Sequence, residues 1–236
     1  MYIREQRLDP NMFLSARPDF TDAGTDTQER AVGWHTGEVG KGVLRDLYGD
    51  EESEEGGTGI EWKWIMLLGF AWESYMVRRV PSESGTIWQP GEMGHRTGLV
   101  GKSKDGRDKG WLYGNVDGYS PEAVWEGKQV EGAAKAGLIL PVLEEFKFTK
   151  KTSNKGPEHK AHFGWRCQIK TYLKMLELEY GGEHRWARLW ACFVNDDYKY
   201  GGGDGPEPYV ACWWFEFTQK EIDDNWRMLI TWLSKQ

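Results

Sequence analysis

Three charged residues, Asp117, Glu126 and Lys128, lie where one short apolar segment ends and the next begins. Asp117 closes the segment Gly114-Asn-Val-Asp117, and the other two lie within Val124-Trp-Glu-Gly-Lys-Gln-Val130. Because side chains alternate across a strand, Glu126 and Lys128 would point to the same face as two valines. One interpretation is a hairpin that turns at Asp117-Gly118 and carries an exposed Glu–Lys pair. The other is a chemical site built from two acids and a lysine.

This pattern resembles the core motif of the PD-(D/E)XK nuclease superfamily, in which an Asp follows a Gly-rich strand and a Glu-x-Lys lies on the next strand. Two more motifs resemble those of its phage lambda-exonuclease and RecB-like branch. They are Leu68-Gly-Phe-Ala-Trp-Glu73 in an upstream helix and Gln168-Ile-Lys-Thr-Tyr172 in a downstream helix. Each motif alone occurs by chance, but the four follow one another in the order of that branch.

The resemblance implies a Mg²⁺- or Mn²⁺-dependent deoxyribonuclease with one or two ions, because carboxylate oxygens select such hard cations. Asp117 and Glu126 would bind the metal together with the backbone carbonyl of Gly127, and Glu73 would hold a second ion. Lys128 would orient the attacking water or stabilise the developing negative charge. Support of the site and contact with DNA are assigned to a larger set of residues: Gln168, Tyr172, Arg78, Arg79, Lys150, Lys151, Arg166 and Lys170.

The charge distribution agrees with a nucleic-acid partner better than the net charge of −7 does. From Phe146 to Lys174, eight lysine and arginine residues stand against one acid, Glu158. A smaller basic cluster lies in the turn 102–110, which we expect to be mobile. Such runs attract the phosphate backbone of DNA.

The helices and strands expected around these residues indicate an α/β fold. It would have a mixed central sheet of about five strands flanked by helices, as in a restriction-endonuclease-like core. Residues 1–30 are expected to form an extended or partly disordered lead-in, and residues 31–236 a single nuclease domain. The helix over 60–80 should bury Leu68 among other apolar residues. The remaining helices are predicted over 36–48, 133–143, 164–178 and from the capping box at Thr218-Gln-Lys-Glu221 onward. The strands are predicted over 86–89, 97–100, 110–117, 124–130, 185–194 and 209–217.

The function expected from the resemblance is a DNA exonuclease of phage-type recombination and repair. A single-strand annealing recombinase is an expected partner besides DNA, and the subunits could form a homo-oligomer. The first cysteine is Cys167, so the chain lacks the upstream cysteine of the iron–sulfur relatives, and no such cluster is expected. His159, His162 and Cys167 lack a fourth ligand for zinc. The odd number of cysteines favours a reducing compartment, and we expect the protein in the cytoplasm of a bacterial or archaeal host cell. The sequence has no long apolar run, so no membrane partner is expected.

Two alternatives stay open at this stage. A structure-selective or site-specific endonuclease of the same superfamily would use the same residues. A non-catalytic binding module would instead use the 14 tryptophans as a binding face, with Glu126 and Lys128 as a surface pair.

Overall fold

A computed structural model describes residues 2–8, 34–48, 60–84, 92–125, 138–149, 157–158, 162–193 and 209–236. The chain folds as α/β with two mixed sheets, which confirms the α/β class of the predicted fold. Within the described part, no helix is long and apolar enough to cross a lipid bilayer.

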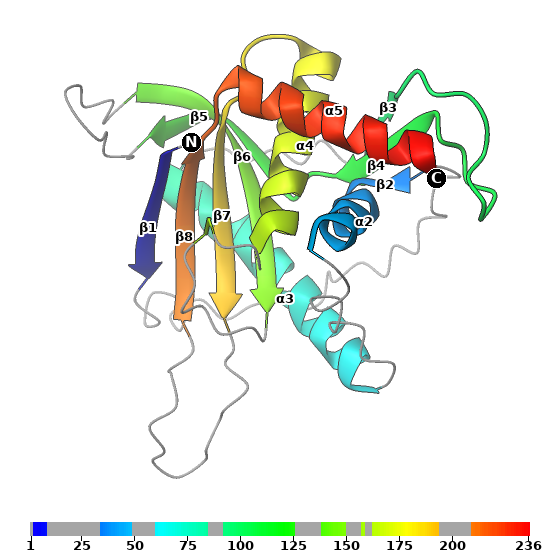
Figure 1. The fold of residues 1–236 in the computed structure, drawn as a ribbon. Helices are drawn as coiled ribbons and strands as arrows, with labels where there is room; N and C mark the ends of the chain where they lie inside the picture. Colours follow the sequence, from blue (N-terminus) through cyan, green and yellow to red (C-terminus); the bar gives the residue numbers. More distant parts are fainter. Residues whose placement is uncertain are drawn as a thin grey trace.

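The larger sheet has the strand order β1-β8-β7-β6-β5 (Figure 1). Neighbouring strands are antiparallel except β6 and β7, which run parallel and are connected by the helix α4. A parallel pair needs such a crossover because a tight turn can join only antiparallel strands. The strands in this order are Tyr2–Leu8, Tyr209–Glu216, Trp186–Phe193, Leu138–Thr149 and Gly118–Trp125.

The smaller sheet contains β2 (Trp34–His35), β4 (Trp111–Asn115) and β3 (Glu92–Arg96). Strand β4 pairs with β2 and β3, whereas β5, which follows it directly, pairs with β6. The chain therefore passes from one sheet to the other at Asp117. The hairpin interpretation, with its turn at Asp117-Gly118, is wrong because β4 and β5 belong to different sheets.

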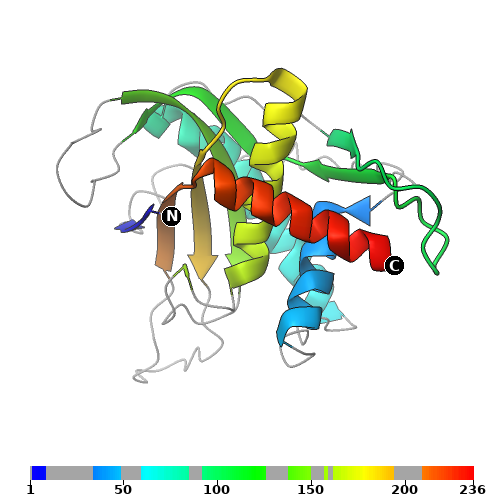
Figure 2. The same ribbon diagram turned by 45° about the horizontal axis from the view of Figure 1, so that its top comes forward.

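Helices cover both faces of the larger sheet. On one face lies α4 (Phe163–Tyr180), with α5 (Gln219–Lys235) and α2 (Thr36–Tyr48) packed against it, and α3 (Ile60–Ser84) crosses the other face (Figures 1 and 2). Each face has its own apolar core, one centred on α4 and the other on the end of α3. Helix α5 begins at the predicted capping box, in which Thr218 Oγ1 accepts from Glu221 N and Glu221 Oε2 accepts from Thr218 N.

Several predicted elements need correction. The segment 138–143, expected in a helix, belongs to strand β6, because a short apolar run has the same sequence pattern in either element. Pro141 is accommodated there because it lies at a β-bulge, between Leu140 and Val142, where neither adjacent strand pairs with it. Residues 97–100 form no strand. Leu68 is 47% exposed, and α3 buries Met76 and Val80 instead.

Candidate active site

Asp117 occupies the junction between the two sheets. The antiparallel register pairs Gly118 with Glu144, so Asp117 comes beside Glu145 on the neighbouring strand β6. Asp117 Oδ2 accepts a hydrogen bond from the backbone N–H of Phe146 at 2.8 Å. This bond fixes the carboxylate against the middle of the segment Glu145-Phe146-Lys147.

Glu145 and Lys147 lie on the face of β6 that α4 covers, since alternate residues of a strand share a face. Lys147 Nζ forms an ion pair with Glu145 Oε1. Glu145 is fully buried, and apart from this ion pair neither of its carboxylate oxygens has a hydrogen-bond partner in the described residues. Such oxygens are costly to bury unless a cation or a proton satisfies them.

Glu73 is a third acid, on α3, close enough to Asp117 for the charge of that carboxylate to affect it. Burial, followed by the nearby negative charge of Asp117, raises the pKa of Glu73 to about 7. Burial likewise raises the pKa of Glu145 to about 8, with a further contribution from Asp117. Although burial opposes it, the carboxylates of Glu145 and Asp117 raise the pKa of Lys147, which keeps its ammonium charged.

The cluster therefore has three carboxyl groups around one ammonium, and the excess negative charge must be balanced by protons or by a cation. Asp117 and Glu145 are the hard oxygen donors that Mg²⁺ and Mn²⁺ prefer. Among the residues that the structure describes, no three His, Cys, Asp or Glu side chains already converge at metal-binding distance. The donor chemistry fits a divalent cation, and Glu145 would have to exchange its contact with Lys147 for one with the metal.

Tyr172 and Gln168 support this cluster from α4. Gln168 Nε2 donates a hydrogen bond to the Tyr172 hydroxyl at 2.8 Å. Tyr172 is buried, and its pKa is raised first by burial and then by the charge of Glu145. The predicted Gln-x-x-x-Tyr pair thus lies directly beside the acids.

Gly114 allows β4 to approach this tyrosine closely. A Cβ atom at position 114 would lie 2.6 Å from both Thr36 Oγ1 and Tyr172 Cε1. Such distances are far below ordinary van der Waals contact, and the neighbours are buried, so they have little room to move. The glycine of the motif Gly114-Asn-Val-Asp117 is therefore required by packing.

We expect Gly114→Ala to lower the free energy of unfolding by about 1–3 kcal/mol, because the added methyl group forces apart α2 and α4. Gly69→Ala is the matched control, since nothing lies within 4 Å of a Cβ at this helical position. The control should gain up to about 1 kcal/mol from the better helix propensity of alanine. Urea unfolding measures both variants, and equal stability of Gly114→Ala and the native protein would contradict the packing argument.

The opposite face of β6 is anchored by a buried ion pair. Glu144 accepts hydrogen bonds from Arg188 Nε at 2.9 and 3.0 Å, from Trp190 Nε1 at 2.8 Å and from Ser120 Oγ at 3.2 Å. The Arg188 guanidinium also lies 4.7 Å from the ring centroid of Trp214. Glu144 directly precedes Glu145, so this network fixes the strand that carries the catalytic candidates.

Arg188→Met should destabilise the protein by about 3–5 kcal/mol, because it leaves the Glu144 carboxylate buried with its charge uncompensated. Combining it with Glu144→Gln should recover part of that loss, since the amide carries no charge. Thermal unfolding of both variants measures the difference. A double variant no more stable than Arg188→Met would show that the charge of Glu144 is not the cause.

The residues predicted from the sequence are partly brought together. Glu73, Asp117, Gln168 and Tyr172 meet in the cluster. The predicted residues that lie outside the described part of the chain are Glu126, Gly127, Lys128, Lys150 and Lys151.

The four predicted DNA-contact residues on the helices do not join the cluster. Arg78 and Arg79 are not among the groups whose charges shift the pKa values of the three acids. Arg166 donates to the carbonyl of Pro157, and the Lys170 ammonium lies 5.9 Å from the ring centroid of Phe217. Their contact with DNA stays a prediction.

Glu145 and Lys147 are the functional candidates that sequence reasoning missed. The sequence did contain a signal, because Glu145-Phe146-Lys147 has the apolar middle residue that is common in the superfamily motif and that Glu126-Gly127-Lys128 lacks.

A comparison with models of known protein families gives no match, and a comparison with curated protein sequences gives none either. The functional assignment therefore rests on the chemistry and geometry of the cluster.

Proposed function

We propose that this protein is a metal-dependent deoxyribonuclease with a restriction-endonuclease-like core. The observation that carries the proposal is the meeting of Asp117, Glu145 and Lys147 at the junction of β4, β5 and β6. Glu73, on α3, is close enough to Asp117 for the charge of that carboxylate to raise its pKa. Two acids can hold the divalent cation that such phosphodiester hydrolysis uses, and a lysine two residues beyond the second acid can stabilise the negative charge that develops on the phosphate.

In this proposal Asp117 and Glu145 hold Mg²⁺ or Mn²⁺, and Glu73 holds a second ion directly or through water. When bound, the metal acts as a Lewis acid on the phosphate and makes its water more acidic. Lys147, released from Glu145, donates a hydrogen bond to the attacking water or to the phosphate oxygen on which negative charge develops. The water oxygen bonds to phosphorus as the bond from phosphorus to the leaving oxygen breaks.

Tyr172 and Gln168 have a positioning role. Tyr172 packs against Gly114 and keeps the end of β4 close to α4, and Gln168 fixes the hydroxyl of the tyrosine. Asp117 lies three residues beyond Gly114, so the packing of the glycine sets the position of the aspartate relative to Glu145.

The more specific proposal is an exonuclease of phage-type recombination and repair. It is supported by the position of the Gln168–Tyr172 pair, since this motif belongs to the exonuclease branch that the sequence resembles. An endonuclease would use the same residues, and only its substrate would differ. A Trp-lined binding module is less well supported, because every tryptophan whose side chain is described is buried or half-buried.

The experiment that tests the proposal compares linear duplex DNA with covalently closed circular DNA in the presence of Mg²⁺ or Mn²⁺. We expect loss of linear DNA only, and no reaction in EDTA. Cutting of the circular DNA would establish the endonuclease alternative. If neither substrate nor single-stranded DNA is cut with either metal, the proposed function is wrong.

A further inference from the structure

The connection between β3 and β4, residues 97–110, is a basic loop that folds back on itself. Its backbone is closed by hydrogen bonds from Ser103 N to Arg107 O at 2.9 Å and from Lys109 N to Gly101 O at 3.1 Å. Gly101 and Gly106 have φ angles of 104° and 86°, in the region that other residues rarely adopt. The sequence predicts a mobile turn here, whereas the structure shows a hydrogen-bonded one.

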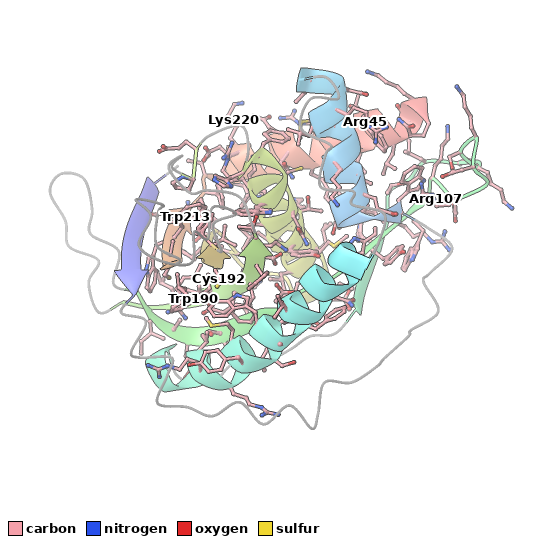
Figure 3. The ribbon with its side chains drawn as sticks, turned by 90° about the horizontal axis from the view of Figure 1, so that it is seen from below. Arg45, Arg107, Trp190, Cys192, Trp213 and Lys220 are labelled. Carbon is pink, nitrogen blue, oxygen red and sulfur yellow. The ribbon has the colours of Figure 1, made fainter. Side chains whose placement is uncertain are left out.

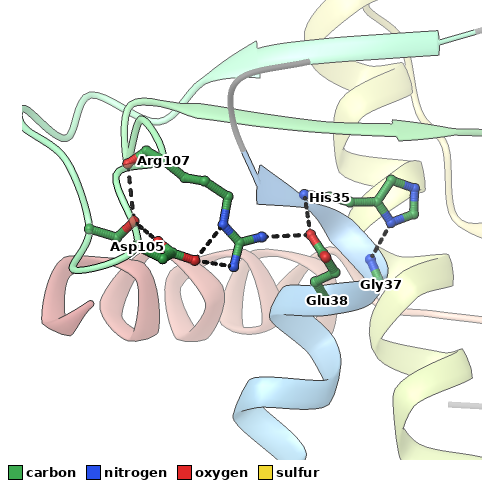
Figure 4. Close-up of polar contacts among 6 residues, drawn as sticks. His35, Gly37, Glu38, Asp105 and Arg107 are labelled. Carbon is green, nitrogen blue, oxygen red and sulfur yellow. Dashed lines mark hydrogen bonds and ion pairs between the residues drawn. The ribbon is translucent and has the colours of Figure 1, made fainter. Parts of the chain in front are cut away.

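Arg107 attaches the loop to the start of α2. Its guanidinium donates to Glu38 Oε2 at 2.9 Å and to Asp105 Oδ2 at 2.7 Å (Figure 4). It also lies 3.4 Å from the ring centroid of Trp34. Glu38 in turn accepts from the backbone N–H of His35. Arg107 is therefore occupied by structural contacts within the protein.

A second attachment joins the loop to the end of α5. Lys104 N donates to Gln236 O at 3.3 Å, and Lys109 Nζ donates to Ser234 O at 3.4 Å. The backbone of the loop is thus held at two separate points, so its side chains project from a fixed position.

Two of the exposed side chains of the loop are lysines without an ion pair within the described residues, whereas the exposed Asp105 is paired with Arg107. These lysines are Lys102 and Lys104. Val100, at the same tip, is 96% exposed. Two ammonium groups on a fixed backbone attract a polyanion without first having to order the loop.

We propose that the loop 97–110 is a second contact site for the backbone of double-stranded DNA, with Lys102 and Lys104 bound to phosphates. The inference rests on the proposed nuclease function and specifies how its substrate is held. Trp111 lies next to the loop, and Asp117 follows it six residues later, shortly after the end of β4. In extended backbone, six residues span about 20 Å. At 3.4 Å per base pair, a duplex that follows β4 from the site would reach the base of the loop about six base pairs from the cleaved bond.

The test measures DNA binding by the variant Lys102→Ala/Lys104→Ala. The control variant is Lys220→Ala/Arg227→Ala, which removes two equally exposed positive charges, 81% and 71% exposed, from α5. Lys220 and Arg107 lie apart in Figure 3, and Lys220 is about 20 Å along α5 from the end on which the loop rests. Fluorescence anisotropy with labelled stem-loop DNA measures the Kd at KCl concentrations from 50 to 300 mM. The buffer contains Ca²⁺, and a gel verifies that the DNA stays intact.

On a stem of 20 base pairs we expect the loop variant to bind roughly tenfold more weakly at 150 mM KCl, with a salt-dependence slope reduced by about 1.8 for two lost phosphate contacts. On a stem of five base pairs, too short to reach the loop, both variants should bind alike. A loop variant with the slope of the control on the long stem overturns the inference. Equal loss on both stems also overturns it, since the contact would then lie near the cut.

These outcomes are distinguishable from failure of the proposed function. If the native protein binds and cuts DNA but the loop variant behaves as the control, only the inference is wrong. If the native protein binds without cutting with any metal, the nuclease proposal is wrong and the slope still decides the inference. A native protein that binds no duplex DNA overturns the inference, and cleavage of single-stranded DNA then decides the nuclease proposal.

Discussion

Glu145→Gln is expected to reduce the rate of DNA cleavage by about a thousandfold or more, whereas Glu126→Gln leaves the rate within about twofold of native. Glu145 is a fully buried carboxylate beside Asp117, and Lys147 is its one hydrogen-bond donor in the part of the chain that the structure describes. The amide removes the charge that would hold the metal, and metal catalysis contributes several kcal/mol to such reactions, each 1.36 kcal/mol being tenfold in rate. The measurement is the initial rate on linear duplex DNA with saturating Mg²⁺.

This pair of variants separates the two acid-x-lysine segments of the sequence. Both substitutions replace a glutamate by its isosteric amide two residues before a lysine, so they are matched in chemistry. Lys147→Met and Lys128→Met form a second matched pair, and only the first should abolish cleavage. Loss of activity in Glu126→Gln with native activity in Glu145→Gln would assign the site to residues 126–128 instead.

Lys147→Met further tests whether the lysine occupies the position of the metal in the metal-free protein. Removing the ammonium leaves the three carboxylates with no compensating positive charge from Lys147. Divalent-cation affinity should therefore be equal to or higher than native, although cleavage is lost. Weaker binding of Mg²⁺ by calorimetry would mean that the lysine supports the metal site rather than competing with it.

Sequence reasoning identified the helices of the site because their signals are local. The apolar spacing of Trp165, Ile169, Tyr172 and Leu176 predicts α4, and with it the common face of Gln168 and Tyr172. The capping box at Thr218 is equally local, since four consecutive residues contain the whole interaction. These features could be predicted and are confirmed.

The position of β6 could not be predicted in the same way. Its segment contains Pro141, and a proline usually excludes a central strand. The proline is tolerated here only because a bulge in the pairing with β5 leaves it without a partner on that strand. The bulge depends on the strand opposite and not on the residues next to the proline. Assigning 138–143 to a helix removed Glu145 and Lys147 from consideration, so one local error displaced half of the candidate site.

The meeting of Asp117 with Glu145 also depends on a non-local feature, the passage of the chain between two sheets. Nothing in the spacing of 28 residues between them specifies contact. The structure supplies it through the register of β5 with β6 and the hydrogen bond from Phe146 to Asp117. The resemblance predicted that such an aspartate and a Glu-x-Lys meet, and within the described residues Glu145-Phe146-Lys147 is the segment beside Asp117. Residues 126–128 lie outside the described part of the chain, so their predicted role stays a prediction.

Metal-free native protein should lose stability as the pH rises from about 5 to 8, and Glu73→Gln should remove part of this loss. The pKa of Glu73 is about 7 in the folded protein, raised mainly by burial from its ordinary value of 4.5. Below pH 4.5 the group is protonated in both the folded and the unfolded state and contributes no difference. Between the two pKa values only the folded state keeps the proton, so stability falls as the pH rises, and the loss is complete above the folded pKa.

At pH 8 in EDTA, Glu73→Gln should therefore be more stable than native by about 1–3 kcal/mol, while the two should converge near pH 5. Glu122→Gln, an exposed substitution on β5, is the control and should change stability at neither pH. Saturating Mg²⁺ should stabilise the native protein more at pH 8 than at pH 6, because protons compete with the metal for the same carboxylates. Urea unfolding in EDTA and in Mg²⁺ measures each difference. Parallel pH profiles for native and Glu73→Gln would show that Glu73 is not held in the acid cluster, and the second-ion role proposed for it would fall with that result.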